Sequence, residues 1–185
     1  MHHLEREWTV DDLASMPDDG NRYEIIDGQL FVTPAPTTRH QRMVGELFAV
    51  LHDYLRREPI GVALFAPLDV VYSDRRIVQP DVLVVPKGRG TLPDRFERGQ
   101  SLLLAVEVLS PSTARADRVS KRRLYAEEGV GEYWIVDLDA RVIERSTPAD
   151  ERPELIVDTL LWRPEGAAAP LVIDVPALFA EVSGG

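Results

Sequence analysis

Apolar side chains recur along the chain with two periods, one typical of helices and one typical of strands. The helical period is clearest between residues 39 and 56, where most large apolar side chains fall on one face of an amphipathic helix. That face consists of Met43, Val44, Leu47, Val50, Leu51, Tyr54 and Leu55. Shorter helices are predicted over residues 10–16, 113–128 and 176–182.

Strands are predicted where apolar residues run together or alternate with polar ones. Two such runs flank Asp27-Gly28, a pair that favours a tight hairpin turn. Further strands are predicted over residues 62–66, 68–72, 77–85, 102–109, 132–138, 141–146, 155–161 and 170–174. The polar residues 86–100 are predicted to form a loop.

These elements predict a mixed α/β fold in which a mixed central sheet is flanked by helices, with an extra N-terminal hairpin and extra C-terminal strands. The length of 185 residues fits a single domain over residues 1–185, with residues 1–8 expected to be flexible. No apolar run is long enough to predict a membrane span or a signal peptide, so a cytoplasmic protein is expected.

The run from Leu102 to Leu109, LLLAVEVL, contains a single charged residue, Glu107. A strand this apolar is normally buried on both faces. A buried carboxylate costs free energy unless it is paired, protonated or bound to a cation. Glu107 is therefore predicted to have a partner elsewhere in the chain or in a bound ion.

A second acid, Asp81, opens the preceding apolar run. Because consecutive strands are often neighbours in a sheet, Asp81 and Glu107 are predicted to meet at one end of it. Two carboxylates in an apolar setting raise each other's pKa. A divalent cation removes this repulsion, and Mg²⁺ is typically held by one or two carboxylates together with water and phosphate oxygens.

The helix predicted over residues 113–128 carries Asp117 and Lys121 on the same stripe as its only large apolar residues, Leu124 and Tyr125. That stripe should face the protein, so Asp117 and Lys121 are predicted to point inward. The basic residues are 19 Arg and only two Lys. Since the chain uses Arg for nearly all of its positive charges, a lysine at position 121 suggests that an ammonium group is needed there, because Lys and Arg are not interchangeable.

The neighbouring face of this helix holds Arg115, Arg118 and Arg122, which are candidates for contacts with a phosphate backbone. Two carboxylates, an ammonium group and a divalent metal suit phosphodiester hydrolysis. The metal lowers the pKa of a water molecule, and the lysine stabilises the charge that develops on the phosphate.

Several segments together resemble the Uma-type restriction-endonuclease-like family of the PD-(D/E)XK nuclease superfamily, over about residues 9 to 180. The segments are Tyr23-Glu-Ile-Ile-Asp-Gly, the helix opening at His40, Pro80-Asp81, Glu107-Val-Leu-Ser-Pro-Ser-Thr, Asp117, Lys121, Tyr125 and Gly129-Val-Gly-Glu-Tyr-Trp-Ile-Val-Asp.

The resemblance implies a restriction-endonuclease-like core and a Mg²⁺- or Mn²⁺-dependent DNA endonuclease. It implies Asp81 and Glu107 as metal ligands, with the carbonyl oxygen of Val108 as a third. The superfamily pattern places a lysine two residues after the acid, where this chain has Leu109. The resemblance implies that the lysine has migrated to the following helix, as Lys121. A homodimer is expected, because cutting both strands of a duplex needs two active sites.

Other interpretations of these residues stay open at this point. Glu107 could be satisfied by an arginine, and Lys121 could form an ordinary helix ion pair with Asp117, which otherwise serves to position Lys121. Glu24 is either a further carboxylate of the site, as the resemblance implies, or an exposed sheet residue. For His40, a surface or capping position is favoured over a role in the site.

The net charge of −10 argues against a general nucleic-acid-binding protein, which usually has an excess of basic residues. Together with Leu109, it keeps open an alternative function, a nuclease-fold module that binds DNA or protein without cutting. The absence of cysteine excludes disulfides, Cys-based metal sites and a cysteine nucleophile.

Overall fold

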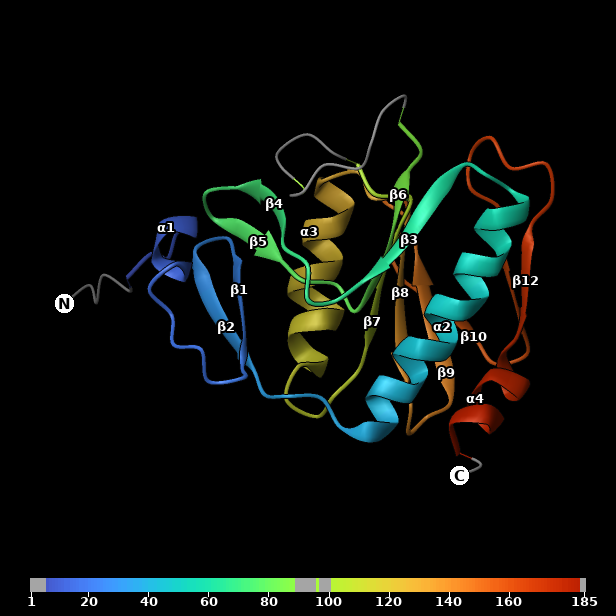
Figure 1. Ribbon diagram of the computed structural model, residues 1–185, viewed down its shortest axis with the longest axis horizontal. Helices are drawn as coiled ribbons and strands as arrows, with labels where there is room; N and C mark the ends of the chain where they lie inside the picture. Colours follow the sequence, from blue (N-terminus) through green and yellow to red (C-terminus); the bar gives the residue numbers. More distant parts are fainter. Residues whose placement is uncertain (1–5, 89–95, 97–100, 184–185) are drawn as a thin grey trace.

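The strands of the computed structural model, which describes residues 6–88, 96 and 101–183, lie in three sheets (Figure 1). The largest has the strand order β10-β9-β8-β7-β6-β3. Its strands are β3 (Gly61–Phe65), β6 (Val82–Pro86), β7 (Leu104–Val108), β8 (Glu132–Asp137), β9 (Val142–Ser146) and β10 (Glu154–Ile156). Strands β7 and β8 are parallel and the other pairs are antiparallel, so the sheet is mixed.

A smaller sheet has the order β2-β1-β5-β4. It consists of β1 (Arg22–Ile26), β2 (Gln29–Thr33), β4 (Val70–Ser73) and β5 (Arg76–Val78). The turn between β1 and β2 has positive φ angles at Asp27 (51°) and Gly28 (80°), the backbone that a tight two-residue hairpin requires. The third sheet pairs β11 (Thr159–Trp162) with β12 (Leu171–Asp174).

The helices are α1 (Val10–Leu13), α2 (Thr38–Arg57), η1 (Ala116–Lys121), α3 (Arg122–Glu127) and α4 (Val175–Ser183). Helix α2 begins where the side chain of Thr37 accepts a hydrogen bond from the His40 backbone N–H at 3.2 Å. The segment η1 is a π-helix that continues directly into α3, and together they form the crossover between the parallel strands β7 and β8.

Alternate residues of the central strands face two different cores, because side chains on a strand point to opposite faces of a sheet. Val106 and Val108 of β7 pack in the core beneath α2 and α4. Ala105 packs in the other core, with Leu124 and Tyr125 of α3. Figure 1 shows α3 and the smaller sheet on one side of the central strands, with α2 and α4 on the other. Glu107 shares the parity of Ala105, so its carboxylate points toward α3.

The mixed sheet with flanking helices confirms the predicted fold class. Two predicted strands are wrong in their extent. Residues 77–85 form β5 and β6 in different sheets, because Pro80 lacks the N–H that a continuing ladder requires. Residues 155–161 likewise divide at Val157-Asp158 into β10 and β11. The helix predicted over 113–128 contains a π-helical segment that the sequence pattern did not indicate.

Some predictions fall wholly or partly outside the described residues. These are the flexible segment 1–8, of which residues 1–5 are not described, and most of the loop 86–100. None of the helices in the described part of the chain is both long enough and apolar enough to cross a membrane.

An ion-pair network at Asp27 fastens the hairpin turn to the neighbouring elements. The Asp27 carboxylate accepts from Arg76 at 2.6 Å and from Arg123 at 2.5 Å. Arg76 also pairs with Glu127 at 2.5 Å and Glu128 at 2.7 Å, near the end of α3. Partial burial would raise the pKa of Asp27, but the two guanidinium groups lower it below its usual value. The network therefore ties the smaller sheet to the helix that lies over the central sheet.

Asp27→Asn is expected to lower the free energy of unfolding by about 1 kcal/mol at pH 7, since the partly exposed ion pairs are weakened by solvent. Asparagine tolerates the positive φ, so the turn itself should persist. Because the folded-state pKa is lowered, the stabilisation is present above the unfolded pKa and is lost as the pH falls through the folded value. Urea unfolding at pH 7 and pH 3 measures both effects.

The control for this prediction is Glu7→Gln, which removes an exposed pair with Arg75. That change should shift the free energy of unfolding by no more than about 0.5 kcal/mol. Equal losses in the two variants at pH 7, or an Asp27→Asn effect that is no smaller at pH 3 than at pH 7, would contradict a stabilising role for the network.

Candidate active site

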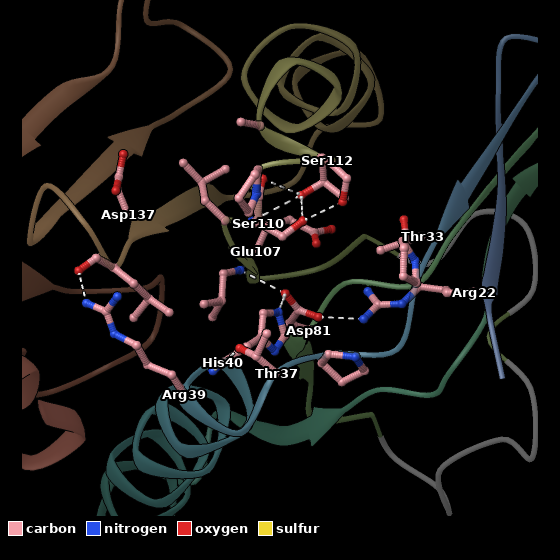
Figure 2. Close-up of a pocket in the computed structure, with 18 of the residues that line it drawn as sticks. Arg22, Thr33, Thr37, Arg39, His40, Asp81, Glu107, Ser110, Ser112 and Asp137 are labelled. Atoms are coloured by element: carbon pink, nitrogen blue, oxygen red, sulfur yellow. Dashed lines mark hydrogen bonds and ion pairs between the residues drawn. The ribbon is translucent and has the colours of Figure 1, made fainter. Parts of the chain in front are cut away.

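The polar residues singled out in the sequence meet where the chain passes from the smaller sheet to the central one, at Gln79-Pro80-Asp81. A cavity of about 490 Å³ opens there. Its walls come from β1, the start of α2, the end of β7 and the helix that follows β7 (Figure 2). Residues lining it include Arg22, Glu24, His40, Asp81, Glu107 and Lys121.

Asp81 is buried, and both oxygens of its carboxylate accept hydrogen bonds. Oδ2 accepts from the Val108 backbone N–H at 2.8 Å and lies 3.1 Å from His40 Nε2. Oδ1 accepts from Arg22 Nη2 at 2.8 Å. Burial would raise the pKa of Asp81, but the His40 contact, the Arg22 charge and the Val108 N–H together lower it to about 2. Asp81 is therefore an ionised carboxylate held in a fixed orientation.

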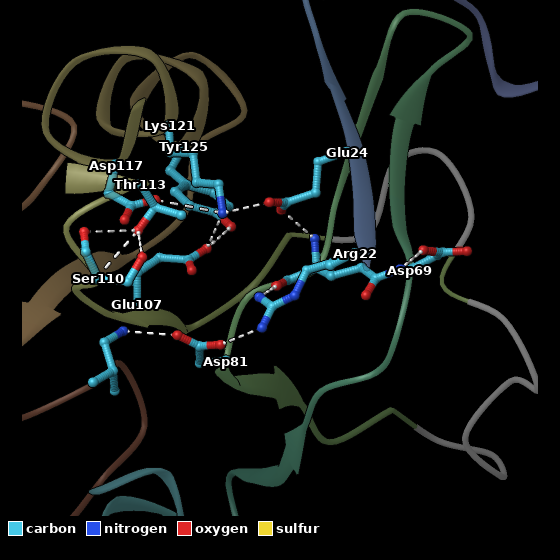
Figure 3. Close-up of polar contacts among 12 residues, drawn as sticks. Arg22, Glu24, Asp69, Asp81, Glu107, Ser110, Thr113, Asp117, Lys121 and Tyr125 are labelled. Carbon is cyan, nitrogen blue, oxygen red and sulfur yellow. Dashed lines mark hydrogen bonds and ion pairs between the residues drawn. The ribbon is translucent and has the colours of Figure 1, made fainter. Parts of the chain in front are cut away.

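Glu107 has the partner that its burial demands. Lys121 Nζ donates to Glu107 Oε1 at 2.9 Å, and the Tyr125 hydroxyl donates to the same oxygen at 3.3 Å (Figure 3). Burial raises the pKa of Glu107 well above its ordinary value, and the nearby carboxylates Asp81, Asp117 and Glu24 add to this although Lys121 opposes it. The two acids of the motif thus have pKa values displaced in opposite directions.

Lys121 is the cation at the centre of the acids. Its ammonium nitrogen lies 2.9 Å from Glu24 Oε2 and 3.5 Å from Asp117 Oδ1, in addition to its bond to Glu107. Only 3% of its side chain is exposed. Burial would lower the pKa of Lys121, but the carboxylates Glu107, Glu24 and Asp117 raise it, so the group stays protonated.

Two polar side chains, Asp117 and Lys121, reach the site from the π-helical segment that follows β7. A π-helix closes hydrogen bonds from residue i to i+5, as the bond from Arg122 N–H to the Asp117 carbonyl shows. Asp117 and Lys121 are both buried there, directly before the apolar residues Leu124 and Tyr125. Asp117 Oδ1 has no hydrogen-bond partner among the described residues, and burial raises the Asp117 pKa.

Glu24 and His40 complete the group. Glu24, at 1% exposure, is a buried member of the acid cluster and not an exposed sheet residue, and its Oε1 accepts from the Gln79 backbone N–H at 2.8 Å. The expectation of a surface or capping position for His40 is wrong for its side chain, which is buried against Asp81. His40 Nδ1 has no hydrogen-bond partner within the described part of the chain.

The predicted phosphate-contacting arginines are not brought together as a free basic track. Arg118 lines the cavity but donates to Glu144 at 2.7 Å and to Asp137 at 2.8 Å. Arg122 lies outside the cavity lining and donates to the carbonyl oxygens of residues 150 and 151. Arg115 is exposed. Two of the three guanidinium groups, those of Arg118 and Arg122, therefore already have hydrogen-bond partners within the protein.

Arg22 is the residue of the site that sequence reasoning missed. It stands at the first position of β1, directly before Tyr23-Glu24, and its side chain crosses to Asp81 on a different sheet. A charged residue at the start of a strand is ordinarily exposed, so the pattern carried no signal for this contact. Only the position of the smaller sheet against the start of β6 brings the two residues together.

The profile of the Uma2 family, described as "Putative restriction endonuclease", matches residues 10–174. The chain belongs to the Uma2 family. The Uma2 match covers every acid and base of the site described above, which confirms the resemblance drawn from the sequence motifs. No curated protein matches the sequence.

Among solved structures, the Uma2 chain is similar to a crystal structure from Anabaena variabilis ATCC 29413, described as "a putative nuclease belonging to DUF820". The TM-score is 0.77 at 22% sequence identity, over 94% of this chain and 98% of the other. The two proteins therefore share their fold along nearly their whole lengths.

The opposite pKa displacements of the two acids predict opposite effects on stability. In a buffer with a chelator that keeps the protein free of metal, Asp81→Asn is expected to lower the free energy of unfolding by about 2 kcal/mol at pH 7. This loss should shrink as the pH falls through about 2, because the lowered pKa of Asp81 stabilises the fold only when the group is ionised. Denaturant unfolding between pH 2 and pH 8 measures the difference.

Glu107→Gln should behave in the opposite way under the same conditions. Because the pKa of Glu107 is raised in the folded protein, this group stabilises the fold at pH values below its pKa in the unfolded chain. The stabilisation is lost as the pH rises through the pKa of Glu107 in the folded protein. The glutamine can still accept from Lys121 and Tyr125, so the variant should match or exceed wild-type stability at pH 8 and fall behind it near pH 4. The same sign for both variants would contradict the electrostatic description of the site.

Proposed function

We propose that this Uma2 protein is a metal-dependent endonuclease that hydrolyses phosphodiester bonds in DNA, using Mg²⁺ or Mn²⁺, in the cytoplasm. The observation that carries the proposal is the contact of Lys121 Nζ with Glu107 Oε1 at 2.9 Å, in a cavity that Asp81 also lines. The superfamily pattern has a lysine where this chain has Leu109. The contact supports the proposal that Lys121 takes the role of that lysine.

The donor set suits a hard divalent cation. Carboxylate oxygens are the ligands that Mg²⁺ prefers. In the described part of the chain the site combines four buried carboxylates, Glu24, Asp81, Glu107 and Asp117, with contacts from two permanently charged groups, Arg22 and Lys121. The acids therefore exceed these cations by two charges, which one divalent ion would balance.

The side chains of the structure are nevertheless not gathered into a finished metal site. Among the described residues, no three His, Asp or Glu groups converge in a way that would hold an ion. The ammonium of Lys121 and the guanidinium of Arg22 lie against the acids instead. Asp81 and Glu107 are the proposed ligands, with the Val108 carbonyl oxygen as a third and Glu24 as a further carboxylate.

When bound, the metal would supply Lewis acidity and a water molecule of lowered pKa. Lys121 is proposed as the catalytic cation that stabilises negative charge on the phosphate, because its raised pKa keeps it protonated and unsuited to act as a base. Asp117 positions Lys121 from the same helix, and His40 orients Asp81 through its 3.1 Å contact. Of the three arginines of this helix, the exposed Arg115 is proposed to contact the DNA backbone, whereas Arg118 and Arg122 would have to leave their partners in the protein to do so.

Asp81→Asn, Glu107→Gln and Lys121→Gln are each expected to lower the rate of Mn²⁺-supported DNA cleavage by at least about 100-fold, the loss typical of removing a group that stabilises a transition state. Isothermal titration of Mn²⁺ should show that binding is lost in Asp81→Asn and Glu107→Gln. In Lys121→Gln it should be retained, because the amide removes a positive charge without removing a proposed ligand.

Two residues outside the cavity lining provide matched controls. Lys87→Gln changes the only other lysine, and Asp69→Asn changes an exposed acid that accepts from Gln79 at 2.7 Å. Both should cleave at the wild-type rate. Cleavage that survives in purified Asp81→Asn and Glu107→Gln would disprove the assignment of the site.

A homodimer is part of the proposal, since two sites are needed to cut both strands of a duplex. Sedimentation equilibrium at micromolar protein should give twice the monomer mass of 20.7 kDa. A strict monomer at these concentrations would restrict the proposal to single-strand cleavage or to assembly on DNA.

The net charge of −10 and the internally paired Arg118 favour the second candidate, a nuclease-fold module that binds DNA or protein without turnover. The two functions differ in their response to Mn²⁺. The module should bind DNA or protein without a divalent ion, and Asp81→Asn should leave that affinity unchanged. The nuclease should lose both metal binding and cleavage in the same variant.

A further inference from the structure

Arg22 contributes a positive charge to the site that the proposed chemistry leaves without a role. Its guanidinium group is held by two acceptors, Asp81 Oδ1 at 2.8 Å and the Gln79 carbonyl oxygen at 2.7 Å. Its side chain is 16% exposed, and it lines the cavity that Asp81 and Glu107 also line (Figure 2). The group is thus fixed beside the acids and not extended into solvent.

The charge of Arg22 acts on the same carboxylates that are proposed to hold the metal. Burial would lower the Arg22 pKa, but Asp81, Glu107 and Glu24 raise it above its usual value. Figure 3 shows the guanidinium between Asp81 and the group formed by Glu24 and Lys121. A divalent ion bound to Asp81 and Glu107 would therefore meet a fixed positive charge in its immediate surroundings.

Asp81 has other orienting contacts besides the one with Arg22. Its Oδ2 is already fixed by the Val108 N–H and by His40 Nε2, whereas Oδ1 has Arg22 as its partner in the described residues. An ionised carboxylate offers only acceptor positions, so the Arg22 guanidinium and a metal ion bound to Asp81 Oδ1 would compete for the same oxygen.

We propose that Arg22 is a positioning residue that competes with the divalent cation for Asp81 Oδ1, so that it holds the acid cluster together until a metal takes its place. The proposal rests on the metal site of the proposed function. On displacement, the guanidinium would remain at the wall of the cavity, where its paired N–H groups suit a phosphate of the substrate.

The test is isothermal titration of Mn²⁺ into the purified full-length wild type and Arg22→Gln. Removal of a competing cation should strengthen Mn²⁺ binding by on the order of tenfold. A purely structural arginine gives the opposite result, because loosening the site weakens metal binding. Unchanged or weaker Mn²⁺ affinity in Arg22→Gln would therefore overturn the proposal.

Two further variants separate charge from fold. Arg22→Lys keeps the charge, so its Mn²⁺ affinity should stay nearer to the wild type than that of Arg22→Gln. Arg76→Gln is the matched control, because Arg76 also bridges carboxylates, Asp27, Glu127 and Glu128, but does not line the cavity. Its Mn²⁺ affinity should equal that of the wild type.

Thermal unfolding gives a second measurement if Arg22→Gln is too unstable for titration. Without metal the variant should melt below the wild type, and saturating Mn²⁺ should raise its Tm by more than it raises that of the wild type, because stabilisation grows with affinity. An equal or smaller rise in Tm would count against competition as decisively as the titration.

Failure of this proposal and failure of the proposed function give different results. Wild-type Mn²⁺ binding that Asp81→Asn abolishes, together with unchanged affinity in Arg22→Gln, overturns only the role of Arg22. No Mn²⁺ binding in the wild type, in Asp81→Asn or in Arg22→Gln overturns both. Binding that is absent in the wild type but gained in Arg22→Gln supports competition in its strongest form.

Discussion

The buried ion pair between Lys121 and Glu107 is the interaction on which the arrangement of the site depends. It joins the end of β7 to the π-helical segment, and the contact of Lys121 with Glu24 at 2.9 Å extends it to β1 of the smaller sheet. Replacing Lys121 with an apolar residue would cost about 3–5 kcal/mol, because the buried carboxylates around it would be left without compensation. Strands β1 and β7 are therefore both joined to the π-helical segment through the ammonium group of Lys121.

The division of the chain at Gln79-Pro80-Asp81 gives the site its second anchor. One continuous strand over this segment would have carried Asp81 along the face of a sheet. Because β5 and β6 belong to different sheets, Asp81 instead stands at their junction, within reach of His40 from α2 and Arg22 from β1. The backbone N–H of Val108 then brings the end of β7 to the same carboxylate.

Sequence reasoning reached the central sheet and several site residues because burial leaves a clear pattern. A single acid in an apolar strand identifies Glu107, and two inward polar residues on a helix stripe identify Asp117 and Lys121. These signals are local, since each compares a residue with its immediate neighbours. The structure confirms that these three side chains lie together and buried.

What the sequence could not provide are the contacts made across sheets. The Arg22–Asp81 bond joins residues 59 positions apart, and no periodicity links the starts of two strands that belong to different sheets. The π-helical turn was equally hidden, because Asp117 and Lys121 have the i, i+4 spacing of an ordinary helix. The inward position of His40 follows from how α2 approaches β6, which is a property of tertiary packing.

The balance of charge connects the site to the acidic character of the whole protein. Four buried carboxylates held by Arg22 and Lys121 leave an excess of two negative charges, which must be met by bound protons or by another cation. Burial and the neighbouring carboxylates raise the pKa of Glu107 and of Asp117, so keeping these acids ionised costs free energy unless a further cation is near.

A divalent ion would satisfy the acids without protonation and would also change what the cavity attracts. A chain with a net charge of −10, whose Arg118 is already paired, has little free positive charge near the site to draw a phosphate inward. Bound metal would bring that charge to the one place where the reaction is proposed to occur. Affinity for the substrate and assembly of the catalytic group would then both depend on metal binding. An acidic protein without the metal would hold DNA weakly and so would not retain it at a site that is unable to cut.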